Sequence, residues 1–422
     1  MKKLAYLESL RGLAAFIVVL NHFAVAFYPA LYFGAAEPVH TKNGIEVFIS
    51  GTPLNLLYNG SFAVSVFFVL SGFVLTYKFF KDRAFPVYLI PLTVKRYVRL
   101  IPPVFVSILL SFLLLRFSLL YNLPASIITR SGWLRGYMHF EPNLLTALYE
   151  SFIGSFFSHQ FTYNGVLWTM TFEFFGSLLV FLFVALFRSM KRRYLVYALA
   201  LALFRRGPYG AFILGMMLSD FITLRPDLFG RKRYTALYFI ILGAGLLLGS
   251  YPAGRPVEGT MYAVMKLPVI ARLYHMFGAG LVLFSLLNLP ALQSVLSRSV
   301  FVFLGKISFS LYILHFLLLG SLGCAIFCFV APHLSYHSAF LVTFLLTVPV
   351  MLIASALTYR FVDQKGVKLS QMVYEHTITG TRRYGRIPMR LVPVSLRSNP
   401  LYRSLFPYET EAGSNAGEIK TI

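Results

Sequence analysis

A succession of apolar segments, each long enough to cross a lipid bilayer, constrains this chain more than any other feature. About 20 consecutive apolar residues in a helix span the ~30 Å hydrocarbon core of a bilayer. Only 13% of the 422 residues are charged, whereas soluble domains contain about 25%. We therefore predict an all-α integral membrane protein. Nearly every residue belongs to a span or a short loop, so an active site would have to be built from the helices.

About ten transmembrane helices are predicted. Eight of them correspond to clear apolar blocks. The third block opens with Pro102 and Pro103, and proline suits the N-terminus of a helix. The eight blocks cover residues 4–28, 60–80, 100–121, 166–187, 234–251, 271–289, 301–330 and 340–361.

The other two predicted spans, residues 194–204 and 210–221, are less regular. Each is shorter than the ~20 residues that a span needs. They form either two short spans or one irregular span, and the basic clusters on both sides favour two crossings. Residues 122–164 are semi-polar and aromatic. We expect this segment to lie at the outer interface or to be re-entrant.

The net charge of +23 is explained by basic loops rather than by nucleic-acid binding. Cytoplasmic loops of membrane proteins carry an excess of Lys and Arg, which here places both termini in the cytoplasm of a multi-pass cell-membrane protein. Residues 1–362 would form the transmembrane domain. Residues 363–422 would form a basic, partly disordered cytoplasmic tail. The basic stretches assigned to the cytoplasmic side are 78–99, 188–193, 231–233, Arg298 and the tail.

The first apolar segment carries a cation and an imidazole that are costly to bury in a membrane. Arg11 and His22 are eleven residues apart, and eleven steps of about 100° bring both side chains to one helix face. They are separated by about 16 Å along the axis. The predicted topology puts Arg11 toward the cytoplasm and His22 toward the outer side. We predict that this face lines a path through the bilayer.

Five motifs resemble those of the membrane-bound acyltransferase 3 family, whose members O-acylate cell-surface sugars and antibiotics. The motifs are LESLRGLAAFIVVLNHF (7–23), FFVLSGFVL (67–75), KRYVRLIPP (95–103), NGVLWTMTFEF (164–174) and LGKISFSLYILHF (304–316). The short segment after Arg193 departs from the family pattern, and the tail after Lys365 finds no match in it.

The resemblance implies an O-acyltransferase that uses acyl-CoA as co-substrate, by family habit acetyl-CoA, and holds no permanent cofactor. The acceptor would be a hydroxyl of an extracytoplasmic glycan or lipid-linked sugar. His22 is the candidate base, because a neutral imidazole suits proton removal from a hydroxyl. It would act in one direct transfer or as a transient acyl carrier. Glu173 lies at a similar expected depth and would orient or stabilise the imidazole.

Arg11, Arg96 and Arg99 are the candidates for binding the acyl donor, because guanidinium groups bind phosphate in bidentate fashion. Each candidate also has a purely structural interpretation. Arg96 and Arg99 would anchor a cytoplasmic span boundary, and Arg11 would pair with Glu8 one turn away. Glu173 would make an interhelical hydrogen bond, and His22 would be a packed histidine of the bundle.

Several other features have no catalytic role assigned. His315 is expected to pack or hydrogen-bond within the bundle, and Cys324 and Cys328 are expected to be core residues rather than a disulfide or metal pair. The sequence contains no metal-ligand spacing, nucleophile elbow or nucleotide-binding loop. The alternative function is a transporter or flippase that uses intramembrane Arg, Glu and His, although we find no internal repeat typical of that class. A third interpretation is an inactive sensor or scaffold.

Overall fold

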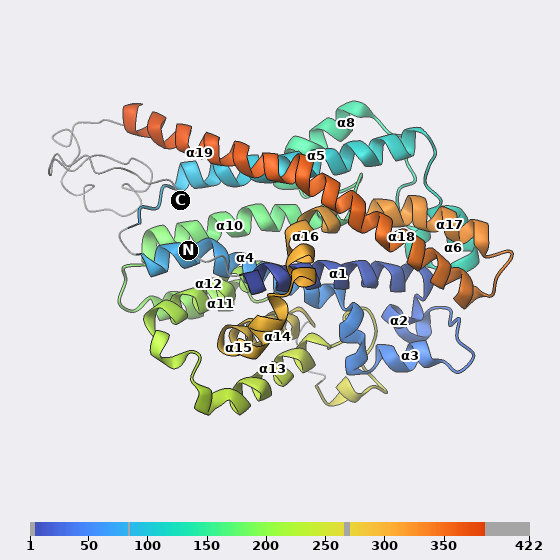
Figure 1. The fold of residues 1–422 in the computed structure, drawn as a ribbon, viewed down its shortest axis with the longest axis horizontal. Coiled ribbons are helices and arrows are strands. Elements are labelled where there is room, and N and C mark those ends of the chain that lie inside the picture. The colour runs from blue at the N-terminus through green and yellow to red at the C-terminus, as the bar shows by residue number, and fades with distance from the viewer. Residues whose placement is uncertain (1–4, 83–84, 266–270, 385–422) are drawn as a thin grey trace.

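The computed structural model describes residues 5–82, 85–265 and 271–384. In these residues the chain folds into helices without a strand, which confirms the all-α prediction (Figure 1). Among the described residues, six helical segments are long and apolar enough to cross a membrane. The number is seven if the helices Ala271–Asn288 and Pro290–Leu296, which are bent by 98°, form one span. The six are Ala5–Phe27, Gly60–Lys81, Leu89–Arg116, Gly165–Phe187, Ser299–Val330 and Tyr336–Ile378. The count of ten and the cytoplasmic termini remain predictions.

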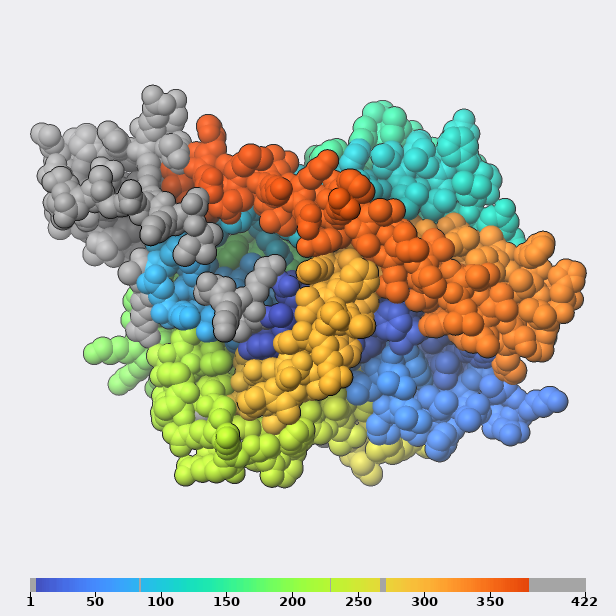
Figure 2. Space-filling view, in the orientation of Figure 1, coloured from blue at the N-terminus to red at the C-terminus, as the bar shows by residue number. Residues whose placement is uncertain are grey.

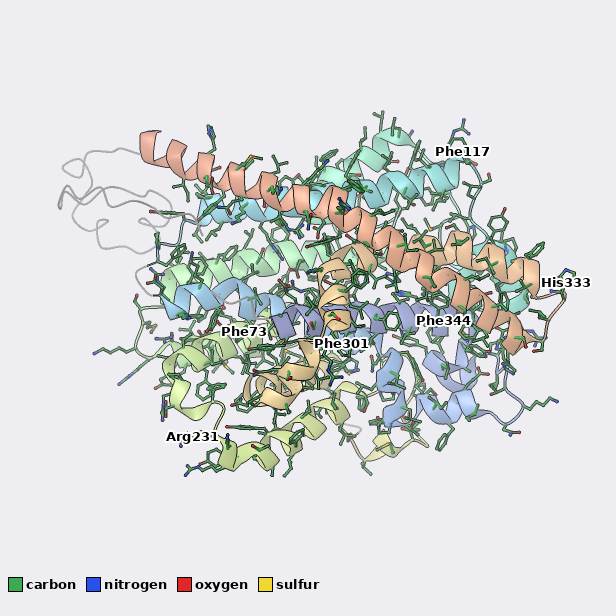
Figure 3. The ribbon with its side chains drawn as sticks, in the orientation of Figure 1. Phe73, Phe117, Arg231, Phe301, His333 and Phe344 are labelled. Atoms are coloured by element: carbon green, nitrogen blue, oxygen red, sulfur yellow. The ribbon has the colours of Figure 1, made fainter. Side chains whose placement is uncertain are left out.

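The bundle combines long helices with shorter ones that fill the spaces between them. The helices of the bundle are α1 (Ala5–Phe27), α4 (Gly60–Lys81), α5 (Leu89–Arg116), α10 (Trp168–Phe187), α11 (Arg193–Phe204), α12 (Tyr209–Leu224), α13 (Thr235–Gly249), α14 (Ala271–Asn288), α15 (Pro290–Leu296), α16 (Ser299–Leu318), α17 (Cys324–Val330), α18 (Tyr336–Thr358) and α19 (Gln364–Tyr384). Figure 3 shows Arg231 toward the end of the bundle where α1 begins and His333 at the opposite end.

Helix α1 lies in the middle of the bundle and crosses α16 at very short range (Figure 1). A Cβ atom on Gly12 would lie 2.4 Å from the backbone nitrogen of Gly305, and one on Gly305 would lie 2.6 Å from the carbonyl carbon of Glu8. Only glycine permits such an approach, as at many helix crossings in membranes. This crossing fixes α1 against the helix that carries Ser308, Tyr312 and His315.

The prediction that Pro102 and Pro103 lie at the N-terminus of a helix is wrong. Helix α5 begins at Leu89, and both prolines lie inside it. Proline removes a backbone hydrogen bond in a helix interior. The turns before the prolines are held by side-chain contacts to other helices instead, which include the ion pairs of Arg96 and Arg99. Both arginines therefore stand on a helix and not in a loop at its boundary.

The short segment after α10 is held by a buried ion pair. Arg193 Nε lies 2.5 Å from Asp220 Oδ2 and Arg193 Nη2 lies 2.8 Å from Asp220 Oδ1, so the contact is bidentate. The hydroxyl of Tyr197 donates a third bond to Oδ2 at 3.0 Å. These contacts tie α11 to α12, which packs against α4. They explain how an apolar helix of 12 residues is secured in this bundle.

Residues 122–164, expected at the outer interface, form short helices instead of a span. They are α6 (Asn122–Thr129), α7 (Gly132–Arg135), α8 (Leu144–Tyr149), the π-helical turn η3 (Glu150–Gly154) and α9 (Ser155–Phe157). Two similarly short helices, α2 (Ala30–Phe33) and α3 (Ile45–Ser50), follow α1.

The last helices continue beyond the expected end of the transmembrane domain. Helix α18 passes through the π-helical turn η9 (Tyr359–Asp363) directly into α19, so the chain is helical on both sides of residue 362. In Figure 2 this helix (orange to red) crosses one face of the molecule, and α1 (dark blue) is visible beside α16. The tail beyond residue 384, predicted to be partly disordered, lies outside the described residues.

Candidate functional site

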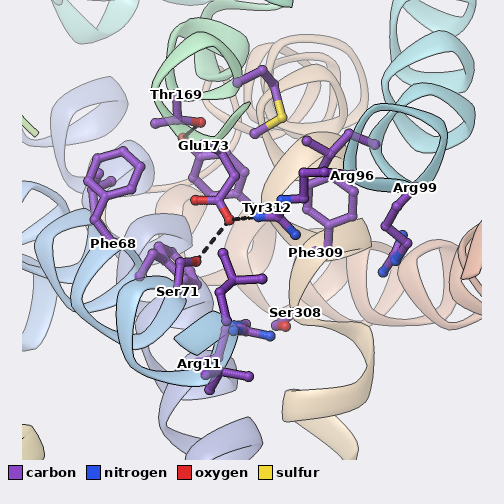
Figure 4. Close-up of a pocket in the computed structure, with 16 residues that line it drawn as sticks. Arg11, Phe68, Ser71, Arg96, Arg99, Thr169, Glu173, Ser308, Phe309 and Tyr312 are labelled. Carbon is purple, nitrogen blue, oxygen red and sulfur yellow. Dashed lines mark hydrogen bonds and ion pairs between the residues drawn. The ribbon is translucent and has the colours of Figure 1, made fainter. Parts of the chain in front are cut away.

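Four of the five predicted site residues line one cavity of about 250 Å³, which we call the cation cavity (Figure 4). Arg11 enters it from α1, Arg96 and Arg99 from α5, and Glu173 from α10. The other lining residues are mostly apolar or hydroxyl-bearing: Val64, Phe67, Phe68, Ser71, Val74, Leu75, Leu100, Thr169, Met170, Ser308, Phe309 and Tyr312. Charged residues far apart in the sequence thus share one enclosed space.

The charges of the cation cavity are only partly balanced. Arg96 Nη2 donates to Glu173 Oε1, which also accepts a hydrogen bond of 2.8 Å from Ser71 Oγ. Arg99 Nη1 donates to Asp363 Oδ1. Arg11 makes no ion pair or hydrogen bond of its side chain within the residues that the structure describes. Among the residues that line the cavity, three guanidinium groups share a single carboxylate, that of Glu173.

Glu173 is not placed beside His22. Its carboxylate accepts from Ser71 and Arg96 in the cation cavity, whereas His22 lines a second cavity. The sequence could place both residues at a similar depth, but it could not show that α5 brings the guanidinium group of Arg96 to Glu173. Glu173 therefore belongs with the arginines.

The second cavity, of about 790 Å³, contains His22 and is called the histidine cavity here. The ring centroid of His22 lies 5.1 Å from that of Trp133 and 5.8 Å from that of Phe316. The wider lining is aromatic and polar: Asn21, Ser61, Trp133, Tyr137, Met138, His139, Phe140, His159, Gln160, Phe161, Thr162, Trp168 and Tyr312 among others. Much of this wall comes from residues 133–162. The segment predicted at the outer interface thus contributes to a cavity around His22.

His22 and His315 form a hydrogen-bonded pair whose protonation can be deduced from its neighbours. Nδ1 of His315 lies 3.0 Å from the carbonyl of Leu311, and Nδ1 of His22 lies 3.0 Å from the carbonyl of Val18. A carbonyl oxygen only accepts, so each Nδ1 must carry the proton. In the neutral ring of His315, Nε2 then accepts from His22 Nδ1 at 3.0 Å. The free lone pair of His22 is therefore on Nε2.

Two residues line both cavities, Val64 and Tyr312. The hydroxyl of Tyr312 donates to the carbonyl of Val166 at 2.9 Å and lies 3.1 Å from Thr169 Oγ1. Its ring centroid lies 5.7 Å from that of Phe67, at an interplanar angle of 71°, and Phe67 also lines the cation cavity. Tyr312 and Val64 are thus the two residues that the cavities share.

Sequence reasoning missed three residues that shape these cavities. Ser71 and Tyr312 lie inside two of the family-like motifs, and their hydroxyl groups within apolar helices were the available signal. The hydrogen bonding predicted for His315 within the bundle is confirmed, and His22 is its partner. Asp363 stands just beyond the last predicted span, and nothing in its surroundings in the sequence points to Arg99.

Three other titratable residues, His275, Cys324 and Cys328, line neither of these two cavities. His275 is fully buried, and its Nε2 lies 2.8 Å from the carbonyl of Tyr251. Cys324 and Cys328 are both free thiols. Across residues 5–82, 85–265 and 271–384, no group of three or more His, Cys, Asp or Glu side chains is arranged to hold a metal ion.

The fold and the site define a helical membrane protein in which the cation cavity adjoins the histidine cavity. The model of the acyltransferase domain family matches residues 4–360. The chain belongs to this acyltransferase family, as the five motifs had suggested.

Named relatives agree with this assignment. The chain is 29% identical to Acyltransferase R4 of a Phoma species over 160 residues, which cover 35% of this chain and 33% of the relative. It is 29% identical to Acyltransferase clz18 of Cochliobolus lunatus over 146 residues, which cover 32% and 31% of the two chains. The match therefore spans about a third of the length of these curated relatives. No solved structure gives a significant match.

Proposed function

We propose that this protein is an integral membrane O-acyltransferase, which moves an acyl group from acyl-CoA to a hydroxyl of an extracytoplasmic glycan or lipid-linked sugar. The acyl group would be acetyl by family habit. The observation that carries the proposal is the pair of adjoining cavities, one cationic and one containing His22, which meet at Tyr312 and Val64. Such an arrangement supports two substrates that approach from different directions.

The donor would place its phosphates in the cation cavity. Of the three arginines that line this cavity, Arg11 makes no ion pair with any described residue. Its guanidinium group is therefore available for a bidentate contact with phosphate. Arg96 and Arg99 would add charge from α5. The predicted topology puts this cavity toward the cytoplasm, where acyl-CoA is made. The thioester would then extend past Tyr312 toward His22.

The acceptor would occupy the histidine cavity. Aromatic faces and a few polar groups are typical of sites for small organic ligands, and they suit the apolar face and hydroxyl groups of a sugar ring. Trp133 and Tyr137 supply such faces, whereas Asn21, Gln160 and Thr162 supply polar groups.

The transfer itself would use the lone pair on His22 Nε2. Nε2 removes the proton of the acceptor hydroxyl while the oxygen of that hydroxyl attacks the thioester carbonyl carbon. The C–O bond forms, the C–S bond breaks, and the proton passes to the departing CoA sulfur. The hydrogen bonds from Nδ1 to Val18 and His315 hold the ring in the required tautomer.

The test is transfer of labelled acetyl groups by purified full-length protein that carries His22→Ala. We expect transfer to fall by roughly 10²- to 10⁴-fold, as for loss of a general base, while CoA binding is retained. His333→Ala, which changes an exposed histidine at the far end of the bundle, is the matched control. Normal transfer by His22→Ala would remove His22 from the mechanism.

The identity of the acceptor requires a second measurement. Mass spectrometry of surface polysaccharide and lipid-linked sugars from cells with and without the gene would reveal an acyl mass and its carrier. Movement of a substrate across vesicles without any acyl-CoA would instead favour the transporter alternative.

A further inference from the structure

Helix α19 and the turn η9 before it lie along the face of α5 that carries Arg99. The contacting residues of α5, at positions 95, 99 and 102, are spaced three or four apart. Their partners are at positions 363, 366, 371 and 374. Lys95 Nζ lies 2.5 Å from Gln371 Oε1 and 4.6 Å from the ring centre of Tyr374. A Cβ atom on Gly366 would stand 3.4 Å from Pro102. The two helices are therefore closely packed.

This helix supplies the acidic partner of a cavity residue. Arg99 lines the cation cavity, but its guanidinium donates to Asp363, whose side chain is only 4% exposed and does not itself line the cavity. The family match ends at residue 360, before Asp363 and α19. The chain thus brings a carboxylate to the arginine cluster from outside the region that defines the family.

We propose that Asp363 is a positioning residue that acts as an internal counter-anion for Arg99 and restrains binding of the acyl donor. The inference rests on the proposed function, because it requires a donor phosphate in the cation cavity. The phosphate and the Asp363 carboxylate both require the guanidinium group of Arg99. Each therefore weakens the contact that the other can make.

Weaker binding of the donor phosphates would help the enzyme to release its product, CoA. Free CoA keeps every phosphate of acyl-CoA after the acyl group has left, so a site that binds the phosphates tightly would also retain the product. Without Asp363, only Arg96 would have a carboxylate partner, and Arg11 and Arg99 would both favour that outcome. When the carboxylate of Asp363 pairs with Arg99 again as CoA departs, it lowers the affinity for acyl-CoA and for CoA. It therefore assists product release.

The test is CoA binding to purified full-length protein that carries Asp363→Asn. Removal of one negative charge next to the cavity should tighten CoA binding by roughly 3- to 10-fold, the scale of one partly screened charge at a few ångströms. Arg99→Gln should weaken binding, and the double variant Arg99→Gln/Asp363→Asn should lose the gain. Asp363→Ser repeats the measurement if the amide leaves the protein unfolded.

Asp227→Asn is the matched control, since it removes the same charge from an exposed Arg–Asp pair elsewhere in the chain. Its CoA affinity should equal that of the wild type. Unchanged or weaker CoA binding by the Asp363 variants, with normal binding by the wild type, would overturn this inference and leave the donor site intact. Absence of CoA binding by the wild type would overturn the proposed function as well.

Discussion

The cation cavity and the histidine cavity are held together in different ways. In the first, the charged groups meet through ion pairs between separate helices, such as Arg96 with Glu173 and Arg99 with Asp363. In the second, His22 and His315 each bond to a carbonyl four residues earlier in their own helix before they bond to each other. The arginines can exchange partners, whereas the histidine pair is oriented in advance. The first arrangement suits reversible binding of an anion and the second suits proton transfer.

The largest effect expected in this comparison follows the loss of Arg11. Arg11→Gln removes the cavity cation that has no ion pair among the described residues, so it should leave no carboxylate unpaired and should not reduce thermal stability. It should raise the KM for acyl-CoA by roughly 10- to 100-fold, the scale of hydrogen bonds to a charged group. Initial rates against acyl-CoA concentration measure this change.

Two further variants sharpen that result. Arg225→Gln removes an exposed arginine outside both cavities and should leave the KM unchanged. Arg96→Gln should lower the melting temperature, because Glu173 would lose its guanidinium partner in a partly buried site. If Arg11→Gln instead destabilised the protein and spared the KM, Arg11 would be a structural residue and the distinction between paired and available arginines would fail.

A smaller effect is expected at the histidine pair. His315→Ala removes one of two acceptors for the Nδ1 proton of His22 and leaves the carbonyl of Val18 in place. The loss of a single hydrogen bond is worth about 0.5–1.5 kcal/mol, so kcat should fall by roughly 2- to 10-fold. The KM for acyl-CoA should not change, because His315 does not line the cation cavity.

Rescue distinguishes positioning from packing at this residue. His315→Gln offers an amide oxygen to the Nδ1 proton of His22 and should recover part of the lost kcat. His315→Leu keeps comparable volume without an acceptor and should not. Equal activity of the two variants would mean that His315 only fills space.

Part of the charged cluster could be predicted from the sequence, because a charged residue in an apolar helix is energetically costly to bury and is easily recognised in the sequence. Arg11 was identified in this way, whereas Arg96, Arg99 and Glu173 were identified within the family-like motifs. The structure brings all four to one cavity. The all-α membrane class follows from the same composition. What each group contacts was less accessible, since Glu173 lies with Arg96 and not with His22.

The histidine pair and the counter-anion could not be anticipated because they depend on distant crossings. His22 and His315 are 293 residues apart, and their contact requires the close passage of α1 and α16 at Gly12 and Gly305. Asp363 reaches Arg99 only because the last helix continues past the expected domain boundary. The wall of the histidine cavity has no regular period, since it is built from short helices and turns.

The smallest expected effect concerns that wall. Glu150 is buried and accepts hydrogen bonds of 3.0 Å from the backbone nitrogens of Thr162 and Tyr163. Glu150→Ala leaves both donors without this partner, at a cost of about 1–3 kcal/mol for each unsatisfied group. Thr162 lines the histidine cavity, so the KM for the acceptor should rise a few-fold, whereas the KM for acyl-CoA should stay constant.

Glu150→Gln separates the hydrogen bonds from the charge. Its single amide oxygen can accept only one of the two backbone hydrogen bonds, because Thr162 and Tyr163 donate to different oxygens of Glu150. The acceptor KM should therefore rise less than it does for Glu150→Ala. Burial raises the pKa of Glu150 above its usual value. The folded state therefore favours the protonated carboxyl, and the wild type loses stability as the pH rises through the raised pKa. The Gln variant has no such titration, so its advantage in melting temperature should grow over that range. A change in the donor KM by either variant would show that the wall of the histidine cavity also controls the cation cavity.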